Sequence, residues 1–390
     1  MINEEGHHSN VIINDALNKY ERLDPRDKAL LVKLIHGTLE YQIRIDRIID
    51  SFSSIKVRKM KPLIRNVLRM SVYQLIYMDK IPDNAVCDEA VKLIKKSALS
   101  GLSGFVNGVL RSIARGKDSV VIRDRASDLS VPGWMYELLA DTVGEDAAED
   151  FFRYSLEEHG VSVRKAGTED VFVLEDASGL TETDEWKQGK LIVQDYSSTL
   201  PVIMADIKPG QTVLDVCAAP GGKSILAAEK TGKEGRVISC DLSDFKIDKI
   251  RENILRMNIT NIETMVQDAT VRDERLVGCA DVVLADCPCS GIGTISKKPE
   301  IKNRLKPEDC RALADIQHKI LCNVCEYVKP GGKLVYSTCT LDHIENEDNL
   351  RRFLESHPEF KLLKEKVMVP SLDAIRPFDG FYIAVMTKNA

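Results

Sequence analysis

Residues 213–224 read VLDVCAAPGGKS, an apolar strand pattern that runs directly into a glycine-rich turn and then into a helix. In this arrangement the backbone can approach a ligand closely, and the first amides of the helix face it. Strand patterns alternate with helical patterns from there to FYIAVM (381–386). The alternation predicts a doubly wound, mainly parallel α/β sheet of the Rossmann-like type.

Each predicted strand is a short apolar run, and helical spacing fills the stretches between the runs. The strands are VLDVCA (213–218), RVISCD (236–241), ETMVQD (263–268), DVVLAD (281–286), KLVYST (333–338) and FYIAVM (381–386). Intervening helices are predicted over 245–258 and 308–328. Parallel strands joined in this way place their carboxyl ends at one edge of the sheet, where such folds bind ligands.

The pattern before this part of the chain is helical. A helix is predicted over 61–78, where apolar residues recur on one face at Leu63, Val67, Met70, Leu75 and Met78. Others are predicted over 27–52, with a break near Gly37, and over 105–116, which ends on a glycine. We therefore expect an all-α bundle over residues 1–125.

A mixed region separates the bundle from the sheet. It combines a helical pattern around 132–158 with the strand-like stretches VSVRK (161–165) and VFVLED (171–176). We interpret residues 126–190 as a small α+β connector and residues 191–390 as the ligand-binding α/β domain.

Composition is typical of a globular cytoplasmic protein. The 390 residues are 44% hydrophobic and 29% charged, enough for two or three domains. No apolar run approaches the roughly 18 residues of a membrane span, and residues 1–10 lack the basic start and apolar segment of a signal peptide. The ten cysteines are therefore expected to be reduced.

Charge divides unevenly along the chain. Residues 1–125 carry a net charge of +7, whereas residues 126–390 carry −13. Basic residues crowd KVRKMKPLIR (56–65) and KKPEIKNRLK (297–306), and such runs bind polyanions or simply form a solvated face. The basic half of the chain is therefore the part suited to contact with a polyanion.

Acidic residues end three successive predicted strands. Asp241 lies nineteen residues after Gly222, about where an acidic residue binds ribose hydroxyls in such folds, and Asp268 and Asp286 end the next two strands. The alternative is that each aspartate only caps the following helix. The turn lacks the G-x-G-x-x-G spacing of a dinucleotide site, which disfavours a nicotinamide-dependent oxidoreductase. Acidic strand ends favour a neutral ribose, an amine and a sulfonium, the groups of S-adenosylmethionine.

Two cysteines follow apolar strands of the same sheet. Cys289 lies in ADVVLADCPCSGIGT (280–294), and Cys339 lies in GGKLVYSTCT (331–340). Both thiols should reach the crevice at the carboxyl ends of the strands, next to the cofactor. The pattern indicates covalent chemistry.

These motifs resemble those of a known family. VLDVCAAPGGKS (213–224), DCPCSG (286–291) and YSTCT (336–340) resemble motifs I, IV and VI of the RNA cytosine-C5 methyltransferases, and QDYSS (194–198) and DGFYIA (379–384) resemble the start and end of their catalytic domain. Residues 65–91 and FVNGVLR (105–111) resemble the NusB-like RNA-binding module. The combination resembles the bacterial enzymes that modify small-subunit ribosomal RNA.

The resemblance implies transfer of a methyl group to C5 of a cytosine. C5 is a weak nucleophile until a thiolate adds at C6, which implies Cys339 as the nucleophile. Cys289 would assist product release, and Asp286 would contact the base. The residues implied in cofactor binding are Cys217, Ala218, Ala219, Pro220, Gly221, Gly222, Lys223, Asp241, Asp268 and Asp286.

The sequence departs from the family in two places. The central segment is contracted, because VSVRKAG passes almost directly to TEDVFVLED, and Lys165 stands where the family has asparagine. Cys287 precedes the motif IV proline where a small residue is expected, and we interpret it as a packing residue. Transfer RNA is the nearest alternative substrate. The alternative from a different functional class is a NusB-like RNA-binding assembly factor without catalytic activity.

The remaining cysteines and a histidine do not predict a metal. Cys322 and Cys325 could join Cys287 and Cys289 in a four-thiolate zinc site, but their helical pattern indicates core packing and zinc would occupy Cys289. We expect His343 to lie in a solvated loop, and we expect no metal and a monomer. The cysteines expected to be packing residues are Cys87, Cys217, Cys240, Cys279 and Cys310.

Overall fold

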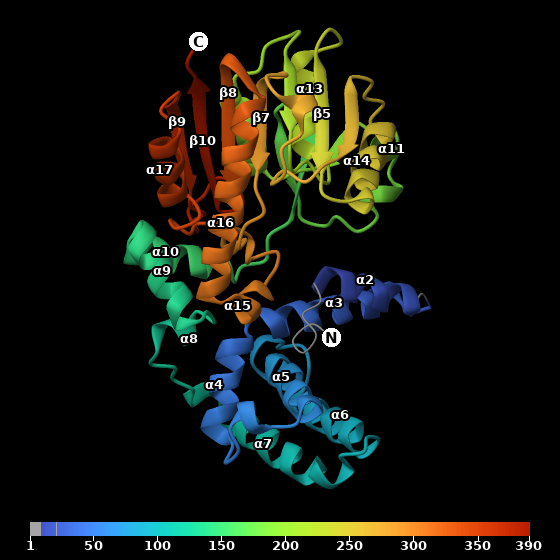
Figure 1. The fold of residues 1–390 in the computed structure, drawn as a ribbon. Helices are drawn as coiled ribbons and strands as arrows, with labels where there is room; N and C mark the ends of the chain where they lie inside the picture. The colour runs from blue at the N-terminus through green and yellow to red at the C-terminus, as the bar shows by residue number, and fades with distance from the viewer. Residues whose placement is uncertain (1–8, 21) are drawn as a thin grey trace. The chain divides into compact units, whose positions relative to one another are not determined.

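The computed structural model describes residues 9–20 and 22–390, so residues 1–8, on which part of the signal-peptide argument rests, lie outside the described residues. The chain forms two compact units (Figure 1). One comprises residues 1–140 together with 295–304, and the other comprises residues 141–294 together with 305–390. The domain boundaries predicted at 125 and 190 stay predictions.

The first unit is helical, as predicted. Its helices are α2 (Ser9–Lys19), α3 (Pro25–Glu40), α4 (Gln42–Phe52), α5 (Pro62–Tyr77), α6 (Asp83–Lys95), α7 (Ser103–Gly116), α8 (Arg125–Asp128) and α15 (Ile301–Arg304). Pro25 and Pro62 occupy the first helical positions of α3 and α5, where the missing amide costs no hydrogen bond. Helices α3, α4, α6 and α7 all contact α5, which lies at the centre of the core.

The stretch predicted as a helix over 27–52 does break, but the break lies at Tyr41 and not at Gly37. Helix α3 continues through Gly37 to Glu40, and the chain leaves helical geometry at Tyr41. A Cβ at Gly37 would lie 2.0 Å from the ring of Tyr73, so glycine is required here for helix packing. The inward face of α5 also differs from the expected one, because Leu63 is 43% exposed and Ile64 is buried in its place.

The second unit contains a seven-stranded sheet with the order β6-β5-β4-β7-β8-β10-β9. The strands are β4 (Thr212–Asp215), β5 (Arg236–Asp241), β6 (Ile262–Val266), β7 (Ala280–Asp286), β8 (Val328–Thr338), β9 (Phe360–Met368) and β10 (Phe381–Lys388). Strands β6, β5, β4, β7 and β8 pair in parallel, and β10 and β9 complete the sheet antiparallel. The doubly wound sheet is confirmed, although β9, an exposed edge strand, was not predicted.

Helices cover both faces of this sheet. Successive strand residues point to opposite faces, so Val282 and Leu284 join one core and Val283 and Ala285 the other. The helices of this unit are α10 (Glu145–Tyr154), α11 (Asp184–Lys187), α12 (Tyr196–Ala205), α13 (Gly222–Thr231), α14 (Asp244–Arg256), α16 (Pro307–Val324) and α17 (Glu347–Ser356). Residues of α12 and α13 pack in the first core, and residues of α16 and α17 pack in the second.

A smaller antiparallel sheet precedes the large one. It has the order β2-β1-β3 and consists of β1 (Val161–Lys165), β2 (Val171–Leu174) and β3 (Leu191–Val193). Arg164 of β1 is fully buried, and its guanidinium pairs with Glu229 of α13 at 2.7 Å. Helix α9 (Gly133–Val143) precedes α10, and Gly144 separates them with a φ of +89°. Among the described residues, no helix is long and apolar enough to cross a membrane.

Candidate active site

The glycine-rich turn lies between β4 and α13 and is fixed by β5. Ala218 donates its amide to the carbonyl of Cys240 at 2.9 Å, and Gly221 adopts a φ of +103°, which favours glycine. Helix α13 begins at Gly222. The sequence-predicted turn therefore lies at the carboxyl end of β4, with the N-terminal amides of a helix beside it.

Asp241, the last residue of β5, and Asp268, two residues after β6, differ in their surroundings. Asp241 is buried, and its carboxylate accepts the amides of Ala219 at 2.9 Å and Leu242 at 2.7 Å and pairs with Lys246 at 2.8 Å. A carboxylate has about four acceptor sites, so this one retains capacity for a ligand hydroxyl. Asp268 is exposed and accepts hydrogen bonds from the hydroxyl and amide of Thr270, which lower the pKa of its carboxyl.

An ion pair connects the turn with the end of β7. Lys223 Nζ lies 2.7 Å from Asp286 Oδ2 and 3.0 Å from the hydroxyl of Ser198. The other oxygen of Asp286 accepts the hydroxyl of Ser337 at 2.7 Å. Burial is the largest single influence and would lower the pKa of the Lys223 ammonium, but the charge and hydrogen bond of Asp286 together with the charge of Asp215 outweigh it, so the pKa is raised. Lys223 therefore stays charged beside the strand ends.

The structure brings the two predicted thiols together. Cys289 follows β7, Cys339 follows β8, and their Sγ atoms lie 3.3 Å apart as free thiols. The loops that carry them are joined by a hydrogen bond from the Gly293 amide to the Cys339 carbonyl at 3.1 Å. The hydrogen bond with Cys339 and then burial raise the pKa of the Cys289 thiol well above its ordinary range.

A buried polar network behind the thiols was not predicted. Glu345 Oε2 accepts the amide of Ser290 at 3.0 Å and the amide group of Gln317 at 2.7 Å. Gln317 also donates to the Pro288 carbonyl, and the Tyr336 hydroxyl donates to the Gln317 side chain. The network therefore holds the loop on both sides of Cys289. The only signal in the sequence is that Glu345 follows Cys339 by six residues.

The other residues weighed in the sequence lie away from this pair or within the core. Cys287, Cys240 and Cys325 are buried in the hydrophobic core, and Cys217 and Cys322 pack against it. Among the described residues, Cys287, Cys289, Cys322 and Cys325 do not converge as a group able to hold a metal. His343 is partly exposed, and its Nδ1 lies 2.9 Å from an oxygen of Asp348.

The two basic runs behave differently. Lys56, Arg58 and Lys59 are exposed around the short helix η1 (Val57–Lys59), while Val57 and Met60 are buried and anchor it. This run can therefore meet a polyanion.

The interpretation of 297–306 as a basic face is wrong at its centre. Lys302 is 1% exposed and donates to the Glu40 carbonyl at 2.8 Å. Glu300 is also buried, and its carboxylate accepts both the amide and the hydroxyl of Ser9. Residues 295–304 belong to the helical unit, where these contacts hold them.

Two protein families match separate parts of the chain. The model of the 16S rRNA methyltransferase RsmB/F family matches residues 202–384, and the model of the NusB family matches residues 1–115. A protein of Bacillus subtilis (strain 168), described as a probable ribosomal RNA small subunit methyltransferase B, is 35% identical and aligns with 98% of this chain and 95% of its own. The ribosomal RNA small subunit methyltransferase B of Vibrio cholerae is 29% identical, with 95% and 91% covered.

The fold agrees with these sequence relationships. A solved structure, that of PH0851, matches with a TM-score of 0.78 and 27% identity, covering 96% of this chain and 93% of that chain. The family match also agrees with S-adenosylmethionine as the predicted methyl donor. The chain belongs to the RsmB/F family of 16S rRNA methyltransferases and carries a NusB-family domain at its N-terminal end.

Proposed function

We propose that this protein transfers a methyl group from S-adenosylmethionine to C5 of a cytosine in 16S ribosomal RNA through a covalent bond between Cys339 and C6. The observation that carries the proposal is the pair of thiols, Cys289 and Cys339, 3.3 Å apart at the ends of adjacent strands. Family membership supports the substrate class.

The residues around the turn fit the proposed cofactor. The amides at the start of α13 suit a carboxylate. The spare acceptor capacity of Asp241 suits ribose hydroxyls. Ala219, Pro220 and Gly222 would contribute backbone, and Asp268 would lie at the adjacent strand end. When bound, the sulfonium supplies the methyl group.

Cys339 and Cys289 have successive tasks in this mechanism. The Cys289 thiol donates a hydrogen bond that stabilises the Cys339 thiolate, which adds to C6 and makes C5 nucleophilic. Asp286 would face the polar edge of the base and accept a hydrogen bond from its amino group, which orients the ring for the addition. After methyl transfer to C5, the proton on C5 must leave and the C6–S bond must break.

Adduct formation itself prepares Cys289 for the second task. The hydrogen bond with Cys339 is the largest cause of the raised pKa of Cys289. Once the Cys339 sulfur is bonded to C6, that hydrogen bond to a thiolate no longer exists, so Cys289 ionises more readily. After losing its proton to solvent, the Cys289 thiolate takes the proton from C5. The electron pair of the C5–H bond reforms the C5–C6 double bond and expels the Cys339 thiolate from C6.

The exposed basic run near η1 supports a role for the NusB-family domain in holding RNA. Lys56, Arg58 and Lys59 are exposed around a short helix anchored by Val57 and Met60, which suits contact with phosphates. These contacts would position the substrate and carry little base specificity.

Bisulfite sequencing of cellular RNA tests the proposal. Cells that lack the protein should lose protection at a cytosine of 16S ribosomal RNA, and wild-type protein but not Cys339→Ala should restore it. Loss of protection only in transfer RNA would identify the rival substrate. Restoration by Cys339→Ala would contradict the covalent mechanism, and unchanged RNA in all strains would favour the assembly-factor alternative.

A further inference from the structure

The loop between β9 and β10, residues 369–380, contacts the part of the active site that carries the thiols. Because β10 runs antiparallel to its neighbour β8, this loop enters the sheet at the edge where Cys339 lies (Figure 1). The Gly380 amide donates to the Gly293 carbonyl at 2.8 Å, and the Gly293 amide donates to the Cys339 carbonyl at 3.1 Å. The loop is therefore attached to the backbone that carries the proposed nucleophile.

Two glycines permit this close approach. A Cβ at Gly293 would lie 2.1 Å from the Gly380 carbonyl oxygen, and a Cβ at Gly380 would lie 2.7 Å from the Cα of Gly293. The loop has a further contact, because the Asp379 amide donates to Oδ1 of Asp195, the residue that caps α12, at 3.0 Å. Backbone contacts thus fix the loop against both the thiol edge and the start of α12.

Arg376 is the basic residue of this loop, and it is exposed. Its guanidinium carbon lies 5.1 Å from the ring centre of Tyr196, the first residue of α12. Its Nη1 donates to the Val171 carbonyl at 3.4 Å. Among the residues that the structure describes, no carboxylate forms an ion pair with Arg376. The guanidinium is therefore held in place without an anionic partner.

Most other exposed arginines of the catalytic unit already have a carboxylate partner. Examples are the pairs Arg236–Glu263 at 2.6 Å, Arg275–Asp273 at 2.5 Å and Arg352–Asp315 at 2.8 Å. A guanidinium is always charged and presents planar donors that match the oxygens of a phosphate. Stacking on an aromatic ring orients this plane. Arg376 is therefore suited to bind an anion at the thiol edge.

The ring beneath Arg376 belongs to a helix that also reaches the active-site ion pair. Ser198, two residues after Tyr196, accepts a hydrogen bond from Lys223 Nζ at 3.0 Å, and Lys223 pairs with Asp286. The first turn of α12 therefore connects the guanidinium with the residues proposed to meet the base.

We propose that Arg376, supported by Tyr196, binds a backbone phosphate of the RNA next to the target cytosine. The proposal rests on the proposed function and names one contact that places the substrate there. A base must leave its stack to reach the thiols, and contacts with phosphates hold the strand while it does so. Arg376 is a positioning residue in this scheme, because it touches no reacting atom.

Filter binding of an unmodified 16S ribosomal RNA transcript over a salt series tests this contact. Arg376→Ala should weaken binding about tenfold and reduce the slope of log affinity against log salt by about 0.7, the effect of one phosphate contact on a single strand. Arg376→Lys keeps the charge and should restore the slope. Arg236→Ala is the matched control, because Arg236 is an exposed arginine that begins β5 at the opposite edge of the sheet.

The support from the ring has a test of its own. Tyr196→Leu should weaken RNA binding, and the double variant with Arg376→Ala should bind no more weakly than Arg376→Ala alone, because both changes remove the same contact. Tyr196→Phe keeps the ring and should bind as the wild-type protein does. Additive losses in the double variant would show that the ring does not act through Arg376.

A crosslink locates the contact on the RNA. Ile375, the fully exposed neighbour of Arg376, can be replaced by the photoreactive residue p-benzoylphenylalanine. On irradiation it should attach to the RNA beside the cytosine that bisulfite sequencing identifies. Attachment only at remote nucleotides would overturn the proposal.

The binding data can overturn the proposal in two other ways. Arg376→Ala with the affinity and slope of Arg236→Ala would exclude the contact. A weaker affinity with an unchanged slope would indicate stacking on a base and not binding of a phosphate. These readouts do not require methyl transfer, so RNA binding that depends on Arg376 in a protein that modifies no cytosine would refute the proposed function and leave the phosphate contact.

Discussion

The Nζ of Lys223 lies 2.7 Å from Oδ2 of Asp286, and this contact joins the helix that starts at the glycine-rich turn to the strand that leads to Cys289. The side chain of Lys223 is 11% exposed and that of Asp286 is 26% exposed. Each partner is therefore shielded from the water that would otherwise solvate its charge. The pair therefore links the glycine-rich turn to the strand that precedes the Cys289 loop.

Breaking this pair should destabilise the fold more than removing both charges. Lys223→Met leaves the Asp286 carboxylate without an ionic partner. Asp286→Asn does the same to the Lys223 ammonium. Each variant should lower the free energy of unfolding by on the order of 3 kcal/mol. The double variant should lose much less than the sum. Urea unfolding of the four proteins measures the coupling, and additive losses would show that the pair contributes nothing beyond its separate contacts.

Removal of each thiol should stop the reaction at a different stage. Cys339→Ala removes the nucleophile and should lower the rate by several powers of ten with no RNA attached. Cys289→Ala should still form the adduct and then accumulate a protein–RNA complex that survives denaturing electrophoresis. Cys322→Ala, which removes a thiol of α16, serves as the control. A complex in Cys339→Ala and none in Cys289→Ala would reverse the assigned roles.

Asp241 should be the main charged contributor to cofactor affinity. Asp241→Ala removes an acceptor for ribose hydroxyls and the charge that holds the Ala219 amide, so S-adenosylmethionine binding should weaken by about 1–3 kcal/mol. Asp244→Ala, an exposed aspartate at the start of α14, should bind normally. Calorimetry measures both, and wild-type affinity in Asp241→Ala would remove this residue from the cofactor site.

Salt dependence should reveal the RNA contacts of the exposed basic run. Neutralising its four cations, Lys56, Arg58, Lys59 and Lys61, should reduce the slope of log affinity against log salt by about 3, since each phosphate contact on a single strand contributes roughly 0.7. The control neutralises four exposed lysines of the catalytic unit, Lys208, Lys361, Lys364 and Lys366. Filter binding over a salt series gives the slopes. Equal slopes for the two variants would mean that the run is only a solvated face.

Stability should fall between about pH 4 and pH 7 because of Asp215. Burial raises the pKa of its carboxyl from 3.8 to about 7, and its Oδ1 has no partner among the described residues. Over that window the unfolded chain loses the proton while the folded chain keeps it, so ionisation favours unfolding, and above about pH 7 the effect is constant.

Asp215→Asn should reduce this loss by a few kcal/mol at most, because one pKa unit corresponds to about 1.4 kcal/mol. Its side-chain oxygen can still accept from Ser224, which donates to Asp215 at 2.7 Å. Unfolding free energies measured from pH 4 to pH 8 provide the comparison. If the unfolding free energies of the wild-type protein and of Asp215→Asn changed equally with pH, Asp215 would not titrate in this range.

The sequence by itself determined most strands of the large sheet and the edge at which the two thiols lie. Apolar runs spaced by helical patterns are a local property, so β4, β5, β7 and β8 were recognisable without tertiary contacts. Cys289 and Cys339 follow strands of the same parallel sheet, whose carboxyl ends necessarily share an edge. Their proximity was therefore predictable, although the separation of their sulfurs was not.

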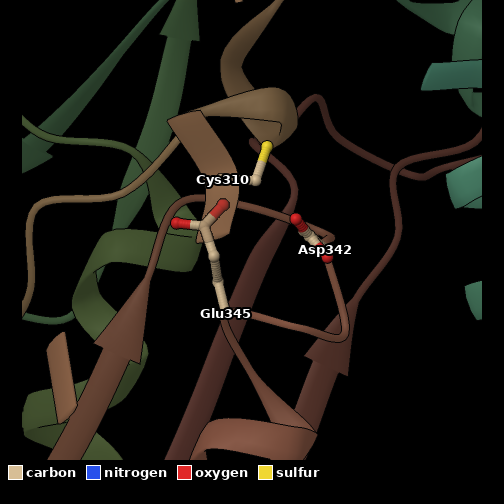
Figure 2. Close-up of side chains that lie close together, drawn as sticks. All are labelled: Cys310, Asp342 and Glu345. Carbon is tan, nitrogen blue, oxygen red and sulfur yellow. The ribbon is translucent and has the colours of Figure 1, made fainter. Parts of the chain in front are cut away.

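Tertiary structure alone decided features whose partners lie far away in the chain. Gly37 reads as a helix break, yet it continues α3 because the Tyr73 ring occupies the space of a side chain. The sequence suggests that Lys302 is a surface cation, but its side chain is buried and donates a hydrogen bond to the Glu40 carbonyl. Cys310 and Glu345 give no local signal that they lie close together, because packing of α16 against the loop after β8 brings them together (Figure 2). Periodicity records which face of an element is buried, and it carries no information about which distant group will cover that face.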